Sequence, residues 1–140
     1  DRLAIAAGLA DGTIDAIASD HTPNTRAATR LHFASAENGI VGLETLLPLS
    51  LGLYHAGALP LLTVLRALTA APAALLRLPG GRLARGAPAD LVLFDLDRPW
   101  RIEVDAFHSK CKNAPYDGRP VQGQAIRTIL GGRSIFAVQS

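Results

Sequence analysis

The segment Ile17–Asn24, with the sequence IASDHTPN, joins a short apolar run to a cluster of polar residues. It overlaps the stretch Thr13–Ser19, TIDAIAS, whose β-branched and small apolar residues have the length of one buried strand. This predicted strand ends at Asp20. In α/β barrels, catalytic groups gather directly after the C-terminal ends of the strands, because the loops there vary while the barrel holds them rigidly. The stretch therefore favours an α/β fold with a functional site at Asp20.

Asp20 and His21 are the candidate chemical groups of this loop. A carboxylate at Asp20 can hold a metal ion through one oxygen and take a proton from a metal-activated water through the other, or it can simply cap the following turn. His21 can be a metal ligand, a substrate contact or a hydrogen-bonding support behind the ligands, and we favour support. The remaining histidines, His32, His55 and His108, lack the His-x-His or His-x-x-x-His spacing of metal ligands. A complete metal site is not expected from this chain alone.

Helices are expected elsewhere in residues 1–80. The first ends at Gly12, after apolar residues at helical spacing in DRLAIAAGLADG. The second covers residues 39–57, GIVGLETLLPLSLGLYHAG, with a kink at Pro48. Its expected apolar face consists of Ile40, Leu43, Leu47 and Leu51. Further helical structure opens at Pro60, is capped again at Thr69 and ends at Pro79-Gly80-Gly81.

Beyond Gly81 the pattern changes to that of strands. ADLVLFDLD and PWRIEV predict one strand each, and QAIRTILGGRSIFAV predicts two strands around Gly131-Gly132. This change predicts two units, residues 1–80 and 81–140, with a boundary near residues 78–86.

Other polar residues near the predicted strand end could contact a ligand. Asn24 and the pair Asn38-Gly39 can offer amide or backbone hydrogen bonds, although Asn-Gly is most often only a turn. The segment 110–118, KCKNAPYDG, carries two lysines that could bind an anion. We favour a solvated loop that packs against the β unit.

The composition excludes several classes of protein. With 140 residues, 49% of them hydrophobic, the chain can bury a core. The net charge is +2 and the Lys and Arg residues are scattered, which argues against nucleic-acid binding; apolar runs too short for a bilayer argue against a membrane protein. The single cysteine, Cys111, excludes an internal disulfide and favours the reducing cytoplasm. Because the chain lacks Met and begins within a helical pattern at Asp1, we expect it to be the C-terminal piece of a longer protein.

Four segments resemble, in this order, the C-terminal third of a dihydroorotase: DGTIDAIASDHTP, GIVGLETLLPLSL, LTAAPAALLRL followed by GGRLARGAPADLVLFDLD, and SKCKNAPYDGRPVQGQAIRTILGGRSIF. The resemblance implies a TIM-type (β/α)8 barrel that holds a zinc centre, usually binuclear, beside a small β-sandwich domain. Residues 1–80 would then be the last barrel strand and the closing helices. Residues 81–140 would be the C-terminal share of the β domain.

The resemblance also implies roles for single residues. Asp20 matches the aspartate that is both a zinc ligand and the acid/base in the reversible hydrolysis of (S)-dihydroorotate to N-carbamoyl-L-aspartate, a step of pyrimidine biosynthesis. Asn24 stands where family members commonly have a substrate-binding histidine, so this chain offers an amide in place of imidazolium charge. Asn38-Gly39 stands where many members have Phe-Gly or Pro-Gly, which contact the substrate through the backbone.

Two alternatives remain beside an active dihydroorotase, which would act alone, as a homodimer or in complex with aspartate transcarbamoylase. One is a non-catalytic dihydroorotase-like subunit that partners aspartate transcarbamoylase; Asn24 favours it and Asp20 opposes it. The other is a different cyclic amidohydrolase such as an allantoinase. In either case the 140 residues alone are expected to be inactive and, because strand edges would be open, prone to associate.

Overall fold

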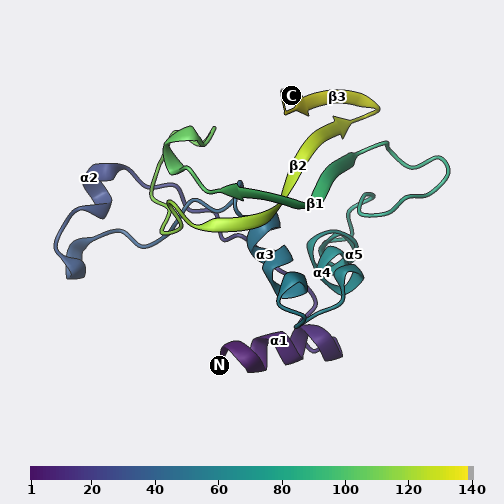
Figure 1. Ribbon diagram of the computed structural model, residues 1–140, viewed down its shortest axis with the longest axis horizontal. Coiled ribbons are helices and arrows are strands. Elements are labelled where there is room, and N and C mark those ends of the chain that lie inside the picture. The colour runs from purple at the N-terminus through teal and green to yellow at the C-terminus, as the bar shows by residue number, and fades with distance from the viewer. Residues whose placement is uncertain (139–140) are drawn as a thin grey trace.

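The computed structural model describes residues 1–138. The α-helices lie before residue 76, and the sheet lies after residue 90 (Figure 1). In chain order the elements are α1 (Arg2–Asp11), α2 (Arg26–Thr29), the 3-10 turn η1 (Phe33–Ser35), α3 (Leu46–His55), α4 (Leu61–Leu68), α5 (Ala70–Leu75), β1 (Leu91–Arg101), the 3-10 turn η2 (Val104–Ala106), β2 (Pro120–Leu130) and β3 (Arg133–Ala137). No helix within residues 1–138 combines the length and the apolar character needed to cross a membrane.

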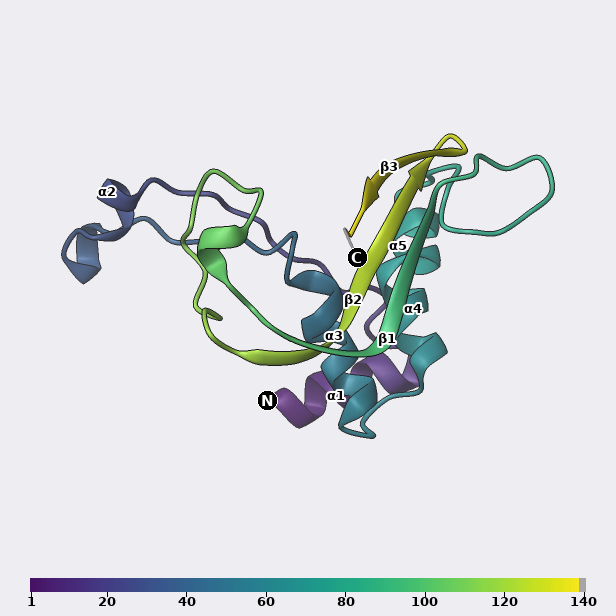
Figure 2. The same cartoon turned by 45° about the horizontal axis from the view of Figure 1, so that its top comes forward.

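The sheet is an antiparallel meander in the order β1-β2-β3. The predicted strands around Gly131-Gly132 are confirmed as the β2–β3 hairpin, whose turn glycines both have positive φ. ADLVLFDLD and PWRIEV, predicted as separate strands, instead share the single strand β1. They form one strand because both pair with β2, on either side of a register shift between Asp95 and Pro99 where the Asp95 carboxylate accepts from the backbone N–H groups of residues 97 and 98. Pairing with β2 then resumes, and the two long strands bend together (Figure 2).

Helix α3 packs against β2. Leu51 of α3 is fully buried at this contact, and a Cβ atom on Gly123 of β2 would overlap its Cδ1. Gly123 also has φ +95°, a conformation that side chains other than glycine's rarely adopt. Its carbonyl accepts from the Trp100 indole N–H at 2.9 Å. The missing side chain at position 123 therefore lets the helix and the sheet approach closely.

A second core joins α1 to α4. Its buried residues are Leu9, Leu59, Val64 and Ala67, and Ile14 and Ile17 pack against them. The Ile17 N–H donates to the Ala67 carbonyl at 3.0 Å. The helical core thus fixes the segment that leads to Asp20.

Thr13–Ser19, predicted as a strand, pairs with no strand within residues 1–138. The parallel bridge that the structure contains here joins His21 to Ile40, beyond the end of the segment. The physical reason is that a strand needs a neighbour, and the segment lies beside helices α1 and α4 instead.

The second predicted helix begins later than expected. α3 starts at Leu46, so Ile40 and Leu43 precede it and do not belong to its apolar face. Pro48 lies in the first turn of α3, where a missing N–H breaks no helical hydrogen bond, and the predicted kink has no basis there. Thr69 does precede α5, but its hydroxyl donates to the Leu65 carbonyl at 2.7 Å rather than capping the helix.

Candidate functional site

The loop after Thr13–Ser19 turns sharply at Asp20. Asp20 has φ +45°, and Asp is one of the few residues besides glycine that tolerate the left-handed region. Two hydrogen bonds hold the turn: the Thr22 hydroxyl donates to the Asp20 carbonyl at 3.1 Å, and the Thr22 N–H donates to the Ile40 carbonyl at 2.8 Å. Asp20 is exposed. Its carboxylate is therefore presented to solvent from a backbone that is tied down on its C-terminal side.

His21 is half-buried and supports the same turn. Its Nδ1 accepts from the Gly42 N–H at 3.1 Å, which in a neutral ring places the proton on Nε2. Gly42 must lack a side chain, because a Cβ there would lie 2.8 Å from the Ser19 carbonyl oxygen. The ring thus holds the start of the α3 segment against the end of the Asp20 segment.

The structure brings Asn24 and Asn38-Gly39 together. The Asn24 side-chain amide donates to the Asn38 carbonyl at 2.8 Å. Gly39 has φ +123°, and a Cβ atom on it would lie 2.6 Å from Thr22 Cβ. We call residues 20–24 the aspartate loop and residues 38–42 the glycine loop. The two loops are in direct contact, so the predicted ligand-binding residues share one place in the fold.

Asn113 is the residue of this site that sequence reasoning missed. Its side-chain amide donates to the carbonyls of Thr22 (3.2 Å) and Gly39 (3.0 Å), and its Oδ1 accepts from the Asn24 N–H at 3.4 Å. Its own carbonyl accepts from the Val41 N–H at 3.2 Å. Asn113 is separated from Asn24 by 89 residues. No local pattern signals such a contact; the only pointer was its place in a segment that resembles dihydroorotases.

Residues 110–118 form a loop, as predicted, but its middle is not fully solvated. Lys112 and Asn113 are both half-buried. Lys112 Nζ donates to the carbonyls of Phe107 (2.6 Å) and Asp105 (3.2 Å). The lysine ammonium thus satisfies two backbone carbonyls in and just after η2, which need hydrogen-bond donors. It is therefore not a free anion site.

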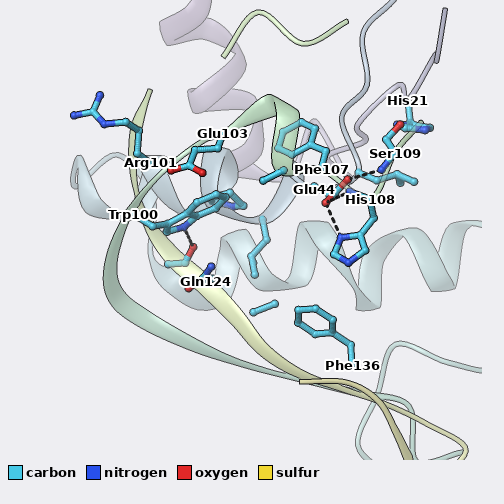
Figure 3. Close-up of a pocket in the computed structure, with 16 residues that line it drawn as sticks. His21, Glu44, Trp100, Arg101, Glu103, Phe107, His108, Ser109, Gln124 and Phe136 are labelled. Atoms are coloured by element: carbon cyan, nitrogen blue, oxygen red, sulfur yellow. Dashed lines mark hydrogen bonds and ion pairs between the residues drawn. The ribbon is translucent and has the colours of Figure 1, made fainter. Parts of the chain in front are cut away.

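A cavity of about 850 Å³ lies between α3, the sheet and residues 103–109 (Figure 3). His21 lines it, but Asp20, Asn24 and Asn38-Gly39 do not. The Glu44 carboxylate accepts from the N–H groups of His108 (3.0 Å) and Ser109 (3.1 Å), and lies 3.2 Å from His108 Nδ1. Desolvation raises the pKa of Glu44, but these hydrogen bonds and the His108 charge together hold it below its usual range. Glu44 thus ties the chain just before α3 to residues 108 and 109. The cavity borders the aspartate loop at His21, whereas Asp20, Asn24 and Asn38-Gly39 lie outside it.

A metal centre needs several ligands close together. Within residues 1–138, no three His, Cys, Asp or Glu side chains are placed so that they could hold a metal ion. Asp20 is thus a single exposed carboxylate. The described residues do not by themselves fit a zinc centre.

The model of the amidohydrolase family matches residues 1–135. The chain is 49% identical to a dihydroorotase of Wolbachia sp. subsp. Drosophila simulans (strain wRi) over 140 residues, which is all of this chain and 32% of that protein. It is 48% identical to a dihydroorotase of Anaplasma phagocytophilum (strain HZ), with 99% of this chain and 31% of that protein covered. The resemblance to dihydroorotases drawn from the sequence is confirmed, and the chain spans about a third of the length of these relatives.

Solved structures match the fold of nearly the whole chain. The L-hydantoinase (dihydropyrimidinase) of Arthrobacter aurescens matches with a TM-score of 0.88 and 29% identity, over 97% of this chain and 32% of that protein. The dihydropyrimidinase of Brevibacillus agri NCHU1002 matches with a TM-score of 0.91 and 24% identity, over 97% of this chain and 31% of that protein. The arrangement of helices and sheet described above is therefore that of a part of such enzymes.

Proposed function

Because this chain belongs to the amidohydrolase family, we propose that it is part of a dihydroorotase, which hydrolyses (S)-dihydroorotate reversibly to N-carbamoyl-L-aspartate. The observation that carries the proposal is 44–49% identity to relatives named dihydroorotase over nearly the whole chain. The hydantoinase structures share the fold at a lower identity of 29% or less. We therefore place the chain with the dihydroorotases rather than with the hydantoinases.

We propose that residues 1–80 are the last strand and the closing helices of a (β/α)8 barrel, and that residues 81–140 are a share of a small β-sandwich domain. Two features support the first part. Thr13–Ser19 carries the half-buried apolar residues Ile14, Ala16 and Ile17 and is followed directly by the exposed carboxylate of Asp20, as a barrel strand would be. Leu3 and Leu62, on α1 and α4, are 80% and 79% exposed, which is unusual for large apolar side chains unless further chain covers them.

In the proposed reaction, a water oxygen adds to the ring carbonyl carbon, the ring C–N bond breaks, and the nitrogen gains a proton. Asp20 takes the proton from the water and delivers it to that nitrogen, and its exposed position on a fixed turn suits this task. A zinc ion would need further ligands from outside this chain, and in the full-length protein it would supply Lewis-acid polarisation of the carbonyl. Asp20 is the one ligand to it that we propose from this chain.

Asn24 is proposed to bind the substrate carboxylate, and Asn38-Gly39 to contact the substrate through the backbone. One N–H of the Asn24 amide is used on the Asn38 carbonyl, and the amide group has a second N–H to offer. Gly39 contributes its backbone and permits the close approach of the aspartate loop. Because an amide carries no charge, the carboxylate would be bound by neutral hydrogen bonds here, which are weaker than charge-assisted ones.

The test is turnover by the full-length parent protein, loaded with zinc, on dihydroorotate, hydantoin and allantoin in parallel. We expect hydrolysis of dihydroorotate to exceed that of the other two by at least tenfold in kcat/KM. Preferential hydrolysis of allantoin would assign the protein to that activity instead. A folded, zinc-loaded parent without any turnover that binds aspartate transcarbamoylase would be the non-catalytic partner subunit.

A further inference from the structure

The side chain of Asn113 makes hydrogen bonds to two different loops at once. One amide N–H reaches the Thr22 carbonyl in the aspartate loop, and the other reaches the Gly39 carbonyl in the glycine loop. From this geometry we infer that Asn113 is a positioning residue, which sets the spacing between Asn24 and Gly39 that the substrate requires. The inference rests on the proposed function of these two loops.

The contacts surround the candidate substrate-binding groups. Thr22 lies midway between Asp20 and Asn24 in the aspartate loop. A hydrogen bond to its carbonyl therefore restrains the backbone that carries both residues. Asn113 Oδ1 receives the Asn24 N–H, and the Asn113 carbonyl receives the Val41 N–H just after Gly39. Every polar group of the side chain thus serves one of the two loops. The loops already touch at Gly39 and Thr22, so the amide holds them at van der Waals contact.

The segment that carries Asn113 is anchored independently of this amide. Lys112 Nζ ties it to the carbonyls of Asp105 and Phe107, which belong to neither of the two loops. The Asn113 side chain is therefore not needed to hold its own segment in place. The effect of Asn113 on the two loops can therefore be measured separately from the anchoring of its own segment. A substitution of Lys112 provides the matched control.

The residue type fits the task. Two carbonyl oxygens face the side chain, so it must present two donors, and an amide does so. Aspartate has nearly the same shape but only acceptors when ionised, and would place charge against both carbonyls. Asn113→Asp therefore removes the donors with little change of volume, and Asn113→Ala removes the whole group.

The experiment uses the zinc-loaded full-length parent, the two Asn113 variants and Lys112→Met. Hydrogen exchange is followed in peptides covering residues 20–25 and 38–42, and kcat and KM are measured for dihydroorotate with the zinc content of each protein. In both Asn113 variants we expect faster exchange in these peptides and a fall in kcat/KM of about 10–100-fold, more in KM than in kcat, at unchanged zinc content. Lys112→Met is expected to leave exchange in these peptides as in the parent.

The inference is overturned if exchange in the Asn113 variants is no faster than in Lys112→Met, or if kcat/KM stays within twofold of the parent. Should Asn113→Ala not fold, Asn113→Asp carries the same comparison. A parent without activity on dihydroorotate would refute the proposed function instead. The exchange comparison, which needs no turnover, would then decide by itself whether Asn113 holds the loops.

Discussion

Asp20 combines an unusual backbone with an exposed carboxylate. A residue other than glycine at φ +45° is uncommon, and such positions cluster at functional sites. The sequence predicted the location of the acid from the apolar run before it, but not the backbone conformation, which depends on the contact of Thr22 with Ile40 across the two loops.

Replacing Asp20 by Asn tests its chemical role. Asn also tolerates the left-handed region, so the fold should be kept, while the proton-accepting group is lost. We expect kcat of the full-length protein for dihydroorotate to fall by at least about 100-fold, the lower end of what general acid–base catalysis contributes. The matched control is Asp15→Asn, an exposed acid in the same segment, which should retain activity. Equal activity of the two variants would remove Asp20 from the mechanism.

At the level of the elements, the packing of α3 on β2 depends on a single glycine. Sequence periodicity predicts that a helix near residues 39–57 exists, but it cannot show which strand residue the helix will meet. Gly123 lies within a strand pattern, where glycine often marks a close backbone approach. The structure identifies that approach as the contact with Leu51.

Gly123→Ala should destabilise the protein by about 2–4 kcal/mol, because it combines backbone strain with overpacking against a fully buried side chain. The measurement is the free energy of unfolding in urea. Gly132→Ala is the control: its φ of +79° brings similar strain, but no atom lies within 4 Å of the added Cβ. A loss in Gly123→Ala no greater than that in Gly132→Ala would show that the helix yields easily.

Glu44 links the start of α3 to residues 108 and 109, and this link should depend on pH. Hydrogen bonds from His108 and Ser109 outweigh desolvation and hold the pKa of Glu44 below its ordinary value. A carboxyl group with a lowered folded-state pKa stabilises the fold above its unfolded-state pKa of about 4.3, and this contribution is lost as the pH falls through the lower folded value. Glu44→Gln should therefore lower the thermal midpoint at pH 7, and the gap to the parent should narrow below about pH 4.

The control for this prediction is Glu103→Gln, an exposed acid that lines the same cavity. It should show a smaller difference from the parent at pH 7. If the midpoint of Glu44→Gln differs from the parent by the same amount at every pH, then its effect comes from packing and the ionised form of Glu44 has no special role.

Across the whole molecule, the sequence predicted what depends on neighbours in the chain. The end of α1 at Gly12, the β2–β3 hairpin and the change from helices to strands all follow from local patterns. The strand predicted at Thr13–Ser19 does not form within residues 1–138, because a strand is defined by its partners. Asn113 was assigned to a solvated loop because its partners lie 74 to 91 residues away. Those contacts exist only once the chain has folded back on itself.

The exposed apolar surface leads to a prediction about the isolated 140-residue chain. Large apolar side chains project from it, among them Leu62 at 79% exposure on α4 and Leu83 at 87% before the sheet. Large apolar side chains left exposed to water favour association. We expect the isolated chain to show concentration-dependent association in sedimentation velocity and no turnover of dihydroorotate, whereas the full-length protein forms one defined species.

Leu3→Lys with Leu62→Lys should reduce the association, since both residues are about four-fifths exposed and a charge costs little there. A monomeric and active isolated chain would contradict both the proposed barrel and the assignment of this chain to only a part of the catalytic site.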